Sequence, residues 1–186
     1  MPFLEIKLGD IFFDSKVQTY CVNPDFKCPN YGHSWACPPE APYLEETISK
    51  YQKFYLIYVK SNLKEYVQKK KAKYPKRNEK RIRNEFFMKN LLRNKFEQEI
   101  FSFIKNFQPL FEEKLILWDG FCRICFNNDD TECTYDSGKP CRYPDKKRYS
   151  MEAVGIDVTK TVTKLNFKLE WPPNHNAYRF GLICLK

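Results

Sequence analysis

The chain has 186 residues, of which 42% are hydrophobic and 17% aromatic, and its formal net charge at pH 7 is +9. This length fits one domain, and the many aromatic residues allow a core to form without disulfides. No stretch approaches the roughly twenty apolar residues of a membrane-spanning helix, and the N-terminus lacks the basic start and apolar run of a signal peptide. We therefore expect a cytoplasmic protein without membrane contact, in which clustered cysteines bind metal or react rather than form disulfides.

The positive charge is concentrated in one segment. Residues 64–95 hold thirteen Lys/Arg against three Asp/Glu, a balance of +10 that leaves the rest of the chain at −1. Such a segment attracts an acidic protein, a nucleic acid or an anionic surface, although a solvated helical hairpin has the same composition. We expect a single domain over residues 1–186 that includes a basic helical segment at about 62–95.

The first quarter of the chain contains short elements and one long loop. Residues 3–14 are predicted to form one or two strands around Gly9, because apolar residues recur there at short intervals. Residues 21–43 contain three Cys and five Pro, which predicts an irregular loop. Residues 44–52 are predicted to form a short helix, since two glutamates at its start suit a helix N-terminus.

The middle of the chain alternates strand and helix. Residues 54–59 are apolar and β-prone, which predicts a central strand buried on both faces. A basic helix follows and is expected to break near Pro75. Residues 84–107 are predicted to form the longest helix, ending before Pro109, because one apolar stripe recurs at helical spacing through Phe87, Leu91, Leu92, Phe96, Ile100, Ile104 and Phe107.

The last third of the chain predicts two more strands and a short helix. Residues 114–118 form the second buried strand, which leads directly into a cysteine-rich loop. Residues 150–155 are predicted to form a short helix with Ser150 as its N-cap, and residues 178–185 the last strand. The alternation predicts the α/β class: a mixed sheet with flanking helices and cysteine-rich loops at one edge.

Seven of the eight cysteines fall into two groups. The first group is Cys21, Cys28 and Cys37, and the second is Cys122, Cys125, Cys133 and Cys141. The second group begins with a C-x-x-C pair, which allows two neighbouring thiolates to reach one metal or adjacent irons. Four thiolates complete the ligand set of a [4Fe–4S] cluster or a tetrahedral zinc ion. The sequence therefore predicts a metal centre at the second group.

The first group supplies only three thiolates, so a fourth ligand must come from elsewhere. The candidates are His33, Cys184, a backbone or carboxylate group, water, or a substrate. A lone histidine is usually not a ligand, and a cysteine inside an apolar strand such as Cys184 is typical of a core position. The sequence leaves this position open.

The spacing of the cysteines favours iron over zinc. Zinc ribbons typically contain two C-x-x-C pairs, whereas this chain contains one, and its other spacings are wide. Proline after Cys28 and Cys37 and the aromatic residues nearby suit a cluster shielded from water. We expect one or two [4Fe–4S] clusters, with zinc as the alternative.

Three segments of the chain resemble those of a known family of predicted metal-binding proteins, domain of unknown function 2284. The segments are C-P-N-Y-G-H-S-W-A-C-P-P at 28–39, the cysteines and C-R-Y-P of 120–144, and S-M-E-A-V-G-I-D-V at 150–158. The resemblance extends from about Ile11 to Leu185 and implies a metal centre, with iron–sulfur the expected kind. Two departures are a longer loop between Cys125 and Cys133 and a richer basic segment near Lys69 to Arg83.

Three functions are consistent with these observations. The first is an iron–sulfur electron-transfer protein whose basic segment docks an acidic redox partner. The second is an enzyme in which the three-thiolate group holds a cluster with one open iron, and Trp35, Tyr31 and Arg142 line the substrate pocket. The third is a zinc-stabilised module that binds nucleic acid, although the chain has no RNA-binding signature. The oligomeric state, and whether the protein is an enzyme at all, stay open.

Overall fold

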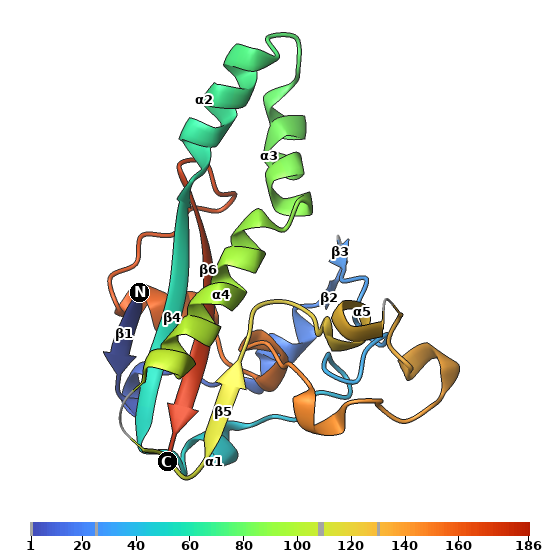
Figure 1. Ribbon diagram of the computed structural model, residues 1–186, viewed down its shortest axis with the longest axis vertical. Helices are drawn as coiled ribbons and strands as arrows, with labels where there is room; N and C mark the ends of the chain where they lie inside the picture. Colours follow the sequence, from blue (N-terminus) through green and yellow to red (C-terminus); the bar gives the residue numbers. More distant parts are fainter. Residues whose placement is uncertain (1, 25, 108–109, 130) are drawn as a thin grey trace.

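The computed structural model describes residues 2–24, 26–107, 110–129 and 131–186, and its centre is a four-stranded sheet (Figure 1). The strand order is β1–β4–β6–β5, with β4 and β6 in the middle and paired along their whole length. The strands are β1 (Phe3–Ile6), β4 (Lys53–Asn62), β5 (Lys114–Leu117) and β6 (Asn176–Leu185). A separate two-stranded hairpin consists of β2 (Val22–Asn23) and β3 (Phe26–Lys27).

The predicted α/β class with flanking helices is confirmed. In the described sheet, the ladders between neighbouring strands are all antiparallel, whereas the sequence predicted a mixed sheet. The helices are α1 (Glu45–Ile48), α2 (Leu63–Lys73), α3 (Glu79–Met88), α4 (Leu91–Asn106), α5 (Ile124–Asp129) and α6 (Val158–Lys164). Helix α4 covers one face of the sheet, and α1 and α6 cover the other, whereas α2 and α3 extend beyond the sheet and α5 lies in a cysteine-rich loop (Figure 1).

Strand β4 is buried on both faces, as its sequence predicts. Tyr55, Ile57 and Val59 belong to the apolar cluster on the side of α4, whereas Phe54 and Leu56 belong to the cluster on the opposite side. This alternation follows from the two-residue period of a strand. The sheet is therefore the middle layer between two apolar clusters.

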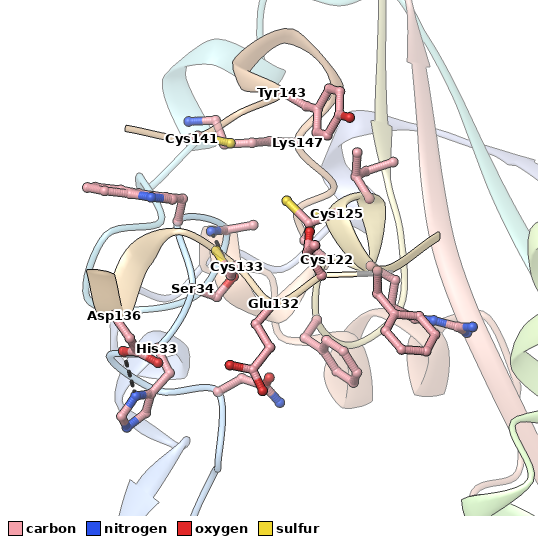
Figure 2. Close-up of a pocket in the computed structure, with 18 of the residues that line it drawn as sticks. His33, Ser34, Cys122, Cys125, Glu132, Cys133, Asp136, Cys141, Tyr143 and Lys147 are labelled. Carbon is pink, nitrogen blue, oxygen red and sulfur yellow. Dashed lines mark hydrogen bonds and ion pairs between the residues drawn. The ribbon is translucent and has the colours of Figure 1, made fainter. Parts of the chain in front are cut away.

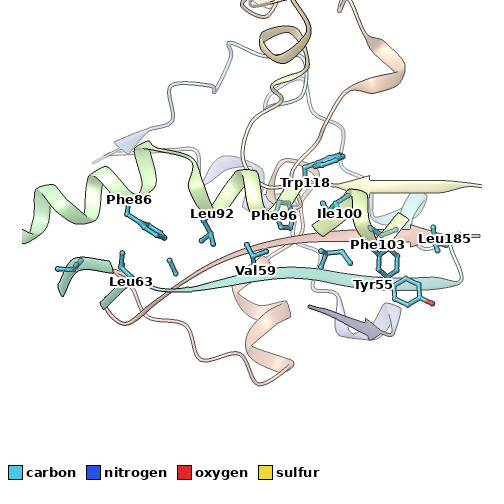
Figure 3. Packing of buried hydrophobic residues seen from close by; sticks show 14 of the residues in the cluster. Tyr55, Val59, Leu63, Phe86, Leu92, Phe96, Ile100, Phe103, Trp118 and Leu185 are labelled. Carbon is cyan, nitrogen blue, oxygen red and sulfur yellow. The ribbon is translucent and has the colours of Figure 1, made fainter. Parts of the chain in front are cut away.

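Helix α4 packs directly on the sheet, and its apolar side chains fill the first cluster (Figure 3). Phe96 and Ile100 are fully buried there. Opposite them, a Cβ atom at Gly181 of β6 would lie 2.5 Å from Phe96 Cζ and 2.5 Å from the Leu117 carbonyl oxygen. Glycine at this position therefore allows the helix to approach the strand closely.

The prediction of one continuous helix over residues 84–107 is wrong, because the chain breaks between α3 and α4. Asn90 adopts the left-handed conformation, with φ of 53°, directly after α3 and before α4. Asparagine is one of the few residues that adopts this conformation readily, and the apolar stripe continues across the break, so the pattern alone does not reveal it. The break lets α3 fold back along α2, and the two helices form a hairpin that projects beyond the sheet (Figure 1).

The face opposite α4 is covered by α1, α6 and several short turns. Cys184 lies here and is fully buried, which confirms its predicted core position. Only the first part of residues 3–14 is a strand, since Leu8–Asp10 form a 3-10 helix. Pro109, the predicted helix terminator, lies outside the described residues. No helix in the described part of the chain has the length and apolar composition needed to cross a membrane.

Candidate metal centre

The cysteine-rich loops lie beside the edge strand β5 (Figure 1). Two cavities are lined by residues of these loops. The chain leaves β5 at Leu117 and reaches Cys122 within five residues. The four-thiol cavity has a volume of about 510 Å³ and is lined by Cys122, Cys125, Cys133 and Cys141. The three-thiol cavity has a volume of about 460 Å³ and is lined by Cys21, Cys28 and Cys37. Each sequence group of cysteines thus surrounds its own cavity.

The β2–β3 hairpin explains why Cys21 and Cys28 meet. Val22 pairs with Lys27, so Cys21 and Cys28 stand opposite each other just before and after the paired strands. The Cys28 N–H donates to the Cys21 carbonyl oxygen at 2.7 Å, and the two side chains are in hydrogen-bond contact. The six-residue spacing between these cysteines is therefore the span of a short hairpin.

Cys37 reaches the same cavity because the loop after Cys28 closes on itself. Gly32, with φ of +70°, donates its N–H to the Pro38 carbonyl oxygen at 2.9 Å. The Cys37 N–H donates to the Ser34 carbonyl oxygen at 3.1 Å, and the Ser34 hydroxyl contacts the Cys37 sulfur. Cys37 is buried, and this burial raises the pKa of its thiol to about 11.

In the second group, the start of α5 positions the C-x-x-C pair. Cys122 precedes the helix and Cys125 lies in its first turn, so both thiols face the same cavity (Figure 2). Helix α5 occupies most of the longer loop by which this chain departs from the family pattern, and its Phe126 side chain is 59% exposed. From this longer loop, Phe126, Thr131 and Glu132 line the cavity.

A closed turn brings Cys133 and Cys141 together. The Thr134 hydroxyl donates to the Pro140 carbonyl oxygen at 2.9 Å, and the Lys139 N–H donates to the Thr134 carbonyl oxygen at 3.3 Å. Gly138 has a φ of +66°, which allows the chain to reverse inside the turn. Cys133 and Cys141 flank this turn on either side, and both line the four-thiol cavity.

The two cysteine loops pack against each other. The Trp35 indole N–H donates to the Lys139 carbonyl oxygen at 3.2 Å, and its ring contacts Tyr135 edge-on with centroids 4.9 Å apart. Asn30 and Phe121 line both cavities, so the cavities share a wall. The sequence alone gives no distance between the two groups, whereas the structure makes them neighbours.

Cationic side chains contact the thiols of the four-thiol cavity. Arg142 hydrogen-bonds to Cys125, and this contact opposes the burial that raises the pKa of the Cys125 thiol. The pKa of Lys147 is raised by its hydrogen bond to Tyr149 and further by the charges of Cys141 and Cys122. These cations compensate part of the negative charge that four thiolates would carry.

The three-thiol cavity contains carboxylates instead. Asp119 is 7% exposed, and burial raises its pKa while the guanidinium of Arg179, 2.9 Å from its Oδ2, opposes this effect. Glu152 also lines the cavity, and desolvation by the surrounding protein raises the pKa of its carboxyl group. Burial raises the pKa of Cys21, with the neighbouring Cys28 and Glu152 adding to the effect.

A buried charge network joins α4 to the base of both cavities. The Glu97 carboxylate lies 2.9 Å from Arg148, 3.7 Å from Arg93 and 3.8 Å from Arg123. The Arg93 guanidinium donates to the Phe121 carbonyl oxygen and thereby holds the wall shared by the cavities. The network fixes the cysteine loops to the sheet layer.

The thiols of the two groups fit the predicted iron–sulfur clusters as ligands, although they line cavities and do not meet at one ion-sized position. All eight cysteines are free thiols. Within residues 2–24, 26–107, 110–129 and 131–186, no three His, Cys, Asp or Glu side chains converge closely enough to hold a single metal ion. Four thiols around one cavity match the ligand set of a multi-atom cluster, and three thiols match it except for one position.

Several sequence candidates have other roles. His33 lines the four-thiol cavity, where its Nδ1 lies 2.9 Å from the Asp136 carboxylate, so it is not a neighbour of the three-thiol group. Trp35 lines the four-thiol cavity, and Arg142 binds Thr131 and the Glu132 carbonyl oxygen. Tyr31 is not among the lining residues of either cavity. The predicted pocket of Trp35, Tyr31 and Arg142 beside the three-thiol group is therefore wrong.

Sequence reasoning missed the charged residues of both cavities. Lys147, Arg179 and Glu152 come from segments outside the two groups of cysteines. The S-M-E-A-V-G segment contained a signal for Glu152, because it places one acidic residue in an otherwise apolar turn. A lone charged residue at the start of a short helix is normally assigned to solvent, so this signal is visible only once the turn is placed beside the thiols.

The fold and the two cavities define a thiol-rich metal-binding protein. The chain matches the family described as "Predicted metal-binding protein (DUF2284)" over residues 4–185. Because the match covers nearly the whole chain, the protein belongs to this family. No curated protein and no solved structure matches the chain.

Proposed function

We propose that the protein is an iron–sulfur protein that transfers electrons, with a [4Fe–4S] cluster held by Cys122, Cys125, Cys133 and Cys141. The observation that supports this proposal most strongly is that these four cysteines line one cavity. Thiolates from one short stretch of chain are the usual ligands of such clusters. The cluster would supply one-electron chemistry, and the protein would set its charge environment and its access to solvent.

The spacing of the donors supports a cluster over a zinc ion. A tetrahedral zinc site needs four donors within about 2.3 Å of one atom. The four thiols instead line a cavity of about 510 Å³, and no three metal-binding side chains of the described residues meet at one ion-sized position. A cube of iron and sulfide has its ligands at its corners and needs this wider arrangement.

The charges around the cavity support a redox role. Arg142 and Lys147 contact or face thiols that become negative ligands. A cluster with four thiolates gains a further negative charge on reduction, and nearby cations stabilise the reduced form. These two residues therefore favour the uptake of an electron at this site.

The basic hairpin supports an acidic protein as the partner. Helices α2 and α3 carry most of the excess positive charge, and several of their cations are paired only with Glu85 or Glu79. The hairpin projects away from the cysteine loops, so a partner bound along it leaves the cavity mouths accessible (Figure 1). We infer that the hairpin steers an acidic partner by long-range attraction and does not itself carry the electron.

The test is the metal content of protein prepared without oxygen. We expect iron and acid-labile sulfide in equal amounts, a brown colour that bleaches on reduction, and an electron paramagnetic resonance signal in the reduced protein. Replacing Cys125 with serine should remove one cluster, since serine is a poorer ligand for iron than cysteine. Colourless protein that binds zinc tightly and takes up no iron under these conditions would contradict the proposal.

A further inference from the structure

The three-thiol cavity lacks one protein ligand for a complete cluster. Two of the sequence candidates for this position are excluded by their places in the fold. His33 lies at the four-thiol cavity beside Asp136, and Cys184 of β6 is fully buried in the apolar cluster on the side of α1 and α6. The remaining protein candidates are backbone groups and carboxylates, and three carboxylates line the cavity, Asp119, Glu152 and Glu170. Glu170 is already engaged, because its Oε1 lies 2.7 Å from His175 Nδ1 and its Oε2 accepts hydrogen bonds from the Asn174 and His175 N–H groups.

Asp119 is already neutralised by arginines. Its Oδ2 lies 2.9 Å from Arg179, and its Oδ1 lies 3.7 Å from Arg93. A carboxylate held between two guanidinium groups gains little from a third cation. Asp119 therefore belongs to the charge network at the base of the cavities.

Glu152 has the opposite environment. Among the residues that the structure describes, no lysine, arginine or histidine forms an ion pair with its carboxylate within 4.0 Å. Its hydrogen-bond partner is the Ser150 side chain, and its charge is felt by Cys21. Arg179 also lines this cavity and its charge acts on Glu152, but its guanidinium is paired with Asp119. Three thiols and the Glu152 carboxylate thus share a cavity in which their ionised forms repel each other, and a bound cationic group reduces this repulsion.

Hydrogen bonds fix the turn that carries Glu152. Met151 and Val154 are fully buried in the core, whereas Ser150, Glu152 and Ala153 line the cavity, and of these three Glu152 carries the ionisable side chain. The Ser150 hydroxyl accepts a hydrogen bond from the Ala153 N–H at 3.1 Å and fixes the turn.

A glutamine then ties this turn to the Cys37 loop. The Gln18 side-chain amide donates to the Ala153 carbonyl oxygen at 2.9 Å and to the Ala41 carbonyl oxygen at 2.8 Å. Ala41 in turn donates its N–H to the Cys37 carbonyl oxygen at 3.0 Å. The carboxylate and the thiol are therefore positioned by one connected set of hydrogen bonds.

We propose that Glu152 is the fourth protein ligand of a second iron–sulfur cluster, held otherwise by Cys21, Cys28 and Cys37. This inference rests on the proposed iron–sulfur function and adds a ligand from a segment without cysteine. A carboxylate is a harder ligand than a thiolate and binds iron less tightly in a sulfur-rich site. The iron bound to Glu152 is thus the exchangeable one, and the second cluster is the place where a small ligand could bind.

The test compares three variants reconstituted with iron and sulfide without oxygen. Glu152→Gln removes the anionic ligand, and Glu152→Cys supplies a fourth thiolate. Glu46→Gln is the control because the Glu46 side chain is exposed and lines neither cavity. We expect Glu152→Gln and Glu152→Cys to change the electron paramagnetic resonance spectrum and the reduction potential of one of two clusters. The other cluster, which disappears in Cys125→Ser, should keep its wild-type spectrum in both variants, and Glu46→Gln should leave both clusters unchanged.

A second readout follows the exchangeable iron directly. Mild oxidation with ferricyanide should convert the second cluster of the wild type to a three-iron form, detected by its electron paramagnetic resonance signal. In Glu152→Cys, the converted fraction should fall at least about tenfold, since loss of a metal ligand or its support typically changes affinity by 10–100-fold. Circular dichroism of each metal-free variant, compared with the wild type, establishes that the substitution leaves the fold intact.

The outcomes separate the two proposals. Wild-type protein without iron and sulfide contradicts the iron–sulfur function itself. A wild type that holds one cluster, lost in Cys125→Ser and retained in Cys28→Ser, leaves that function standing and overturns the second cluster. Two clusters whose spectra and ferricyanide sensitivity are the same in Glu152→Gln, Glu152→Cys and the wild type overturn the role of Glu152 alone.

Discussion

The two cysteine cavities differ in the charges that face their thiols. In the four-thiol cavity, Arg142 and Lys147 approach the sulfur atoms, and the four thiols come from one stretch of twenty residues, 122–141. In the three-thiol cavity, the thiols of residues 21–37 face the unpaired carboxylate of Glu152. The cysteine thiols therefore lie in two electrostatic environments. The cations at the four-thiol cavity stabilise added electrons, and the carboxylate at the three-thiol cavity stabilises an added cation.

If both proposed clusters are present, this difference predicts different tasks for the cavities. A site with four thiolates and adjacent cations has no free position and is suited to accept and release electrons. A site with three thiolates and a carboxylate has one weaker bond and is suited to ligand exchange. Substitutions in one cavity should therefore affect measurements that those in the other leave unchanged.

The largest effect should come from removing a thiol ligand. We expect Cys125→Ser and Cys28→Ser each to lose about half of the iron and sulfide of the wild type, because each serine replaces a ligand of a different cluster. The two variants should lose different resonance signals. Loss of all iron in both variants would show instead that the cavities hold one shared metal group.

The next largest effect concerns the charge network around Glu97, which lies below both cavities. Glu97→Gln should lower the free energy of unfolding by about 3–5 kcal/mol, since it removes the anion shared by Arg123 and Arg148 and leaves Arg93 with Asp119 alone. Chemical denaturation of the metal-free protein measures this change. Glu99→Gln, two residues further along α4, serves as the control and should stay within about 0.5 kcal/mol of the wild type.

A smaller effect should distinguish the redox properties of the cavities. Lys147→Ala should lower the reduction potential of the four-thiol cluster by on the order of 10–40 mV, because a partly screened charge contributes about 0.2–1 kcal/mol. Redox titration followed by resonance spectroscopy measures the shift. Lys146→Ala is the matched control, and an equal shift in both variants would contradict a specific role of Lys147.

The smallest effect on metal content is expected at Cys184. Burial raises the pKa of its thiol to about 12, so in native protein at pH 8 it should resist alkylation that modifies the other cysteines once metal is removed. Mass spectrometry after labelling measures this difference. Cys184→Ala should keep the full iron content of the wild type, and a loss of iron would show that the eighth cysteine also serves a metal centre.

Much of the fold could be predicted from the sequence where local pattern and burial agree. The apolar run at 54–59 is the central strand, and the pattern after Asn62 is the basic helix that ends before Pro75. The helix break at Asn90 could not be predicted, because the apolar stripe continues through it and one left-handed residue leaves no periodic signal. On either side of the break the helices have different neighbours, since α3 packs against α2 and α4 packs on β4.

The candidate site could be predicted in composition and only partly in arrangement. The grouping of thiols into four and three follows from spacing, because a hairpin joins Cys21 to Cys28 and a closed turn joins Cys133 to Cys141. The two cysteine groups lie next to each other, and Glu152 lies beside the first group, because residues more than a hundred positions apart contact each other. The hydrogen bond between Gln18 and Ala153 is one such contact. Spacing along the chain carries no information about such contacts.

The wall of Asn30 and Phe121 between the cavities has a consequence for reduction. Cys37 and Cys122 are close enough for each to feel the charge of the other across this wall. An electron placed on one side therefore makes the next electron harder to place on the opposite side. With both cavities filled, the chain is expected to take up its two electrons in separate steps, as two unequal sites that influence each other rather than as two independent ones.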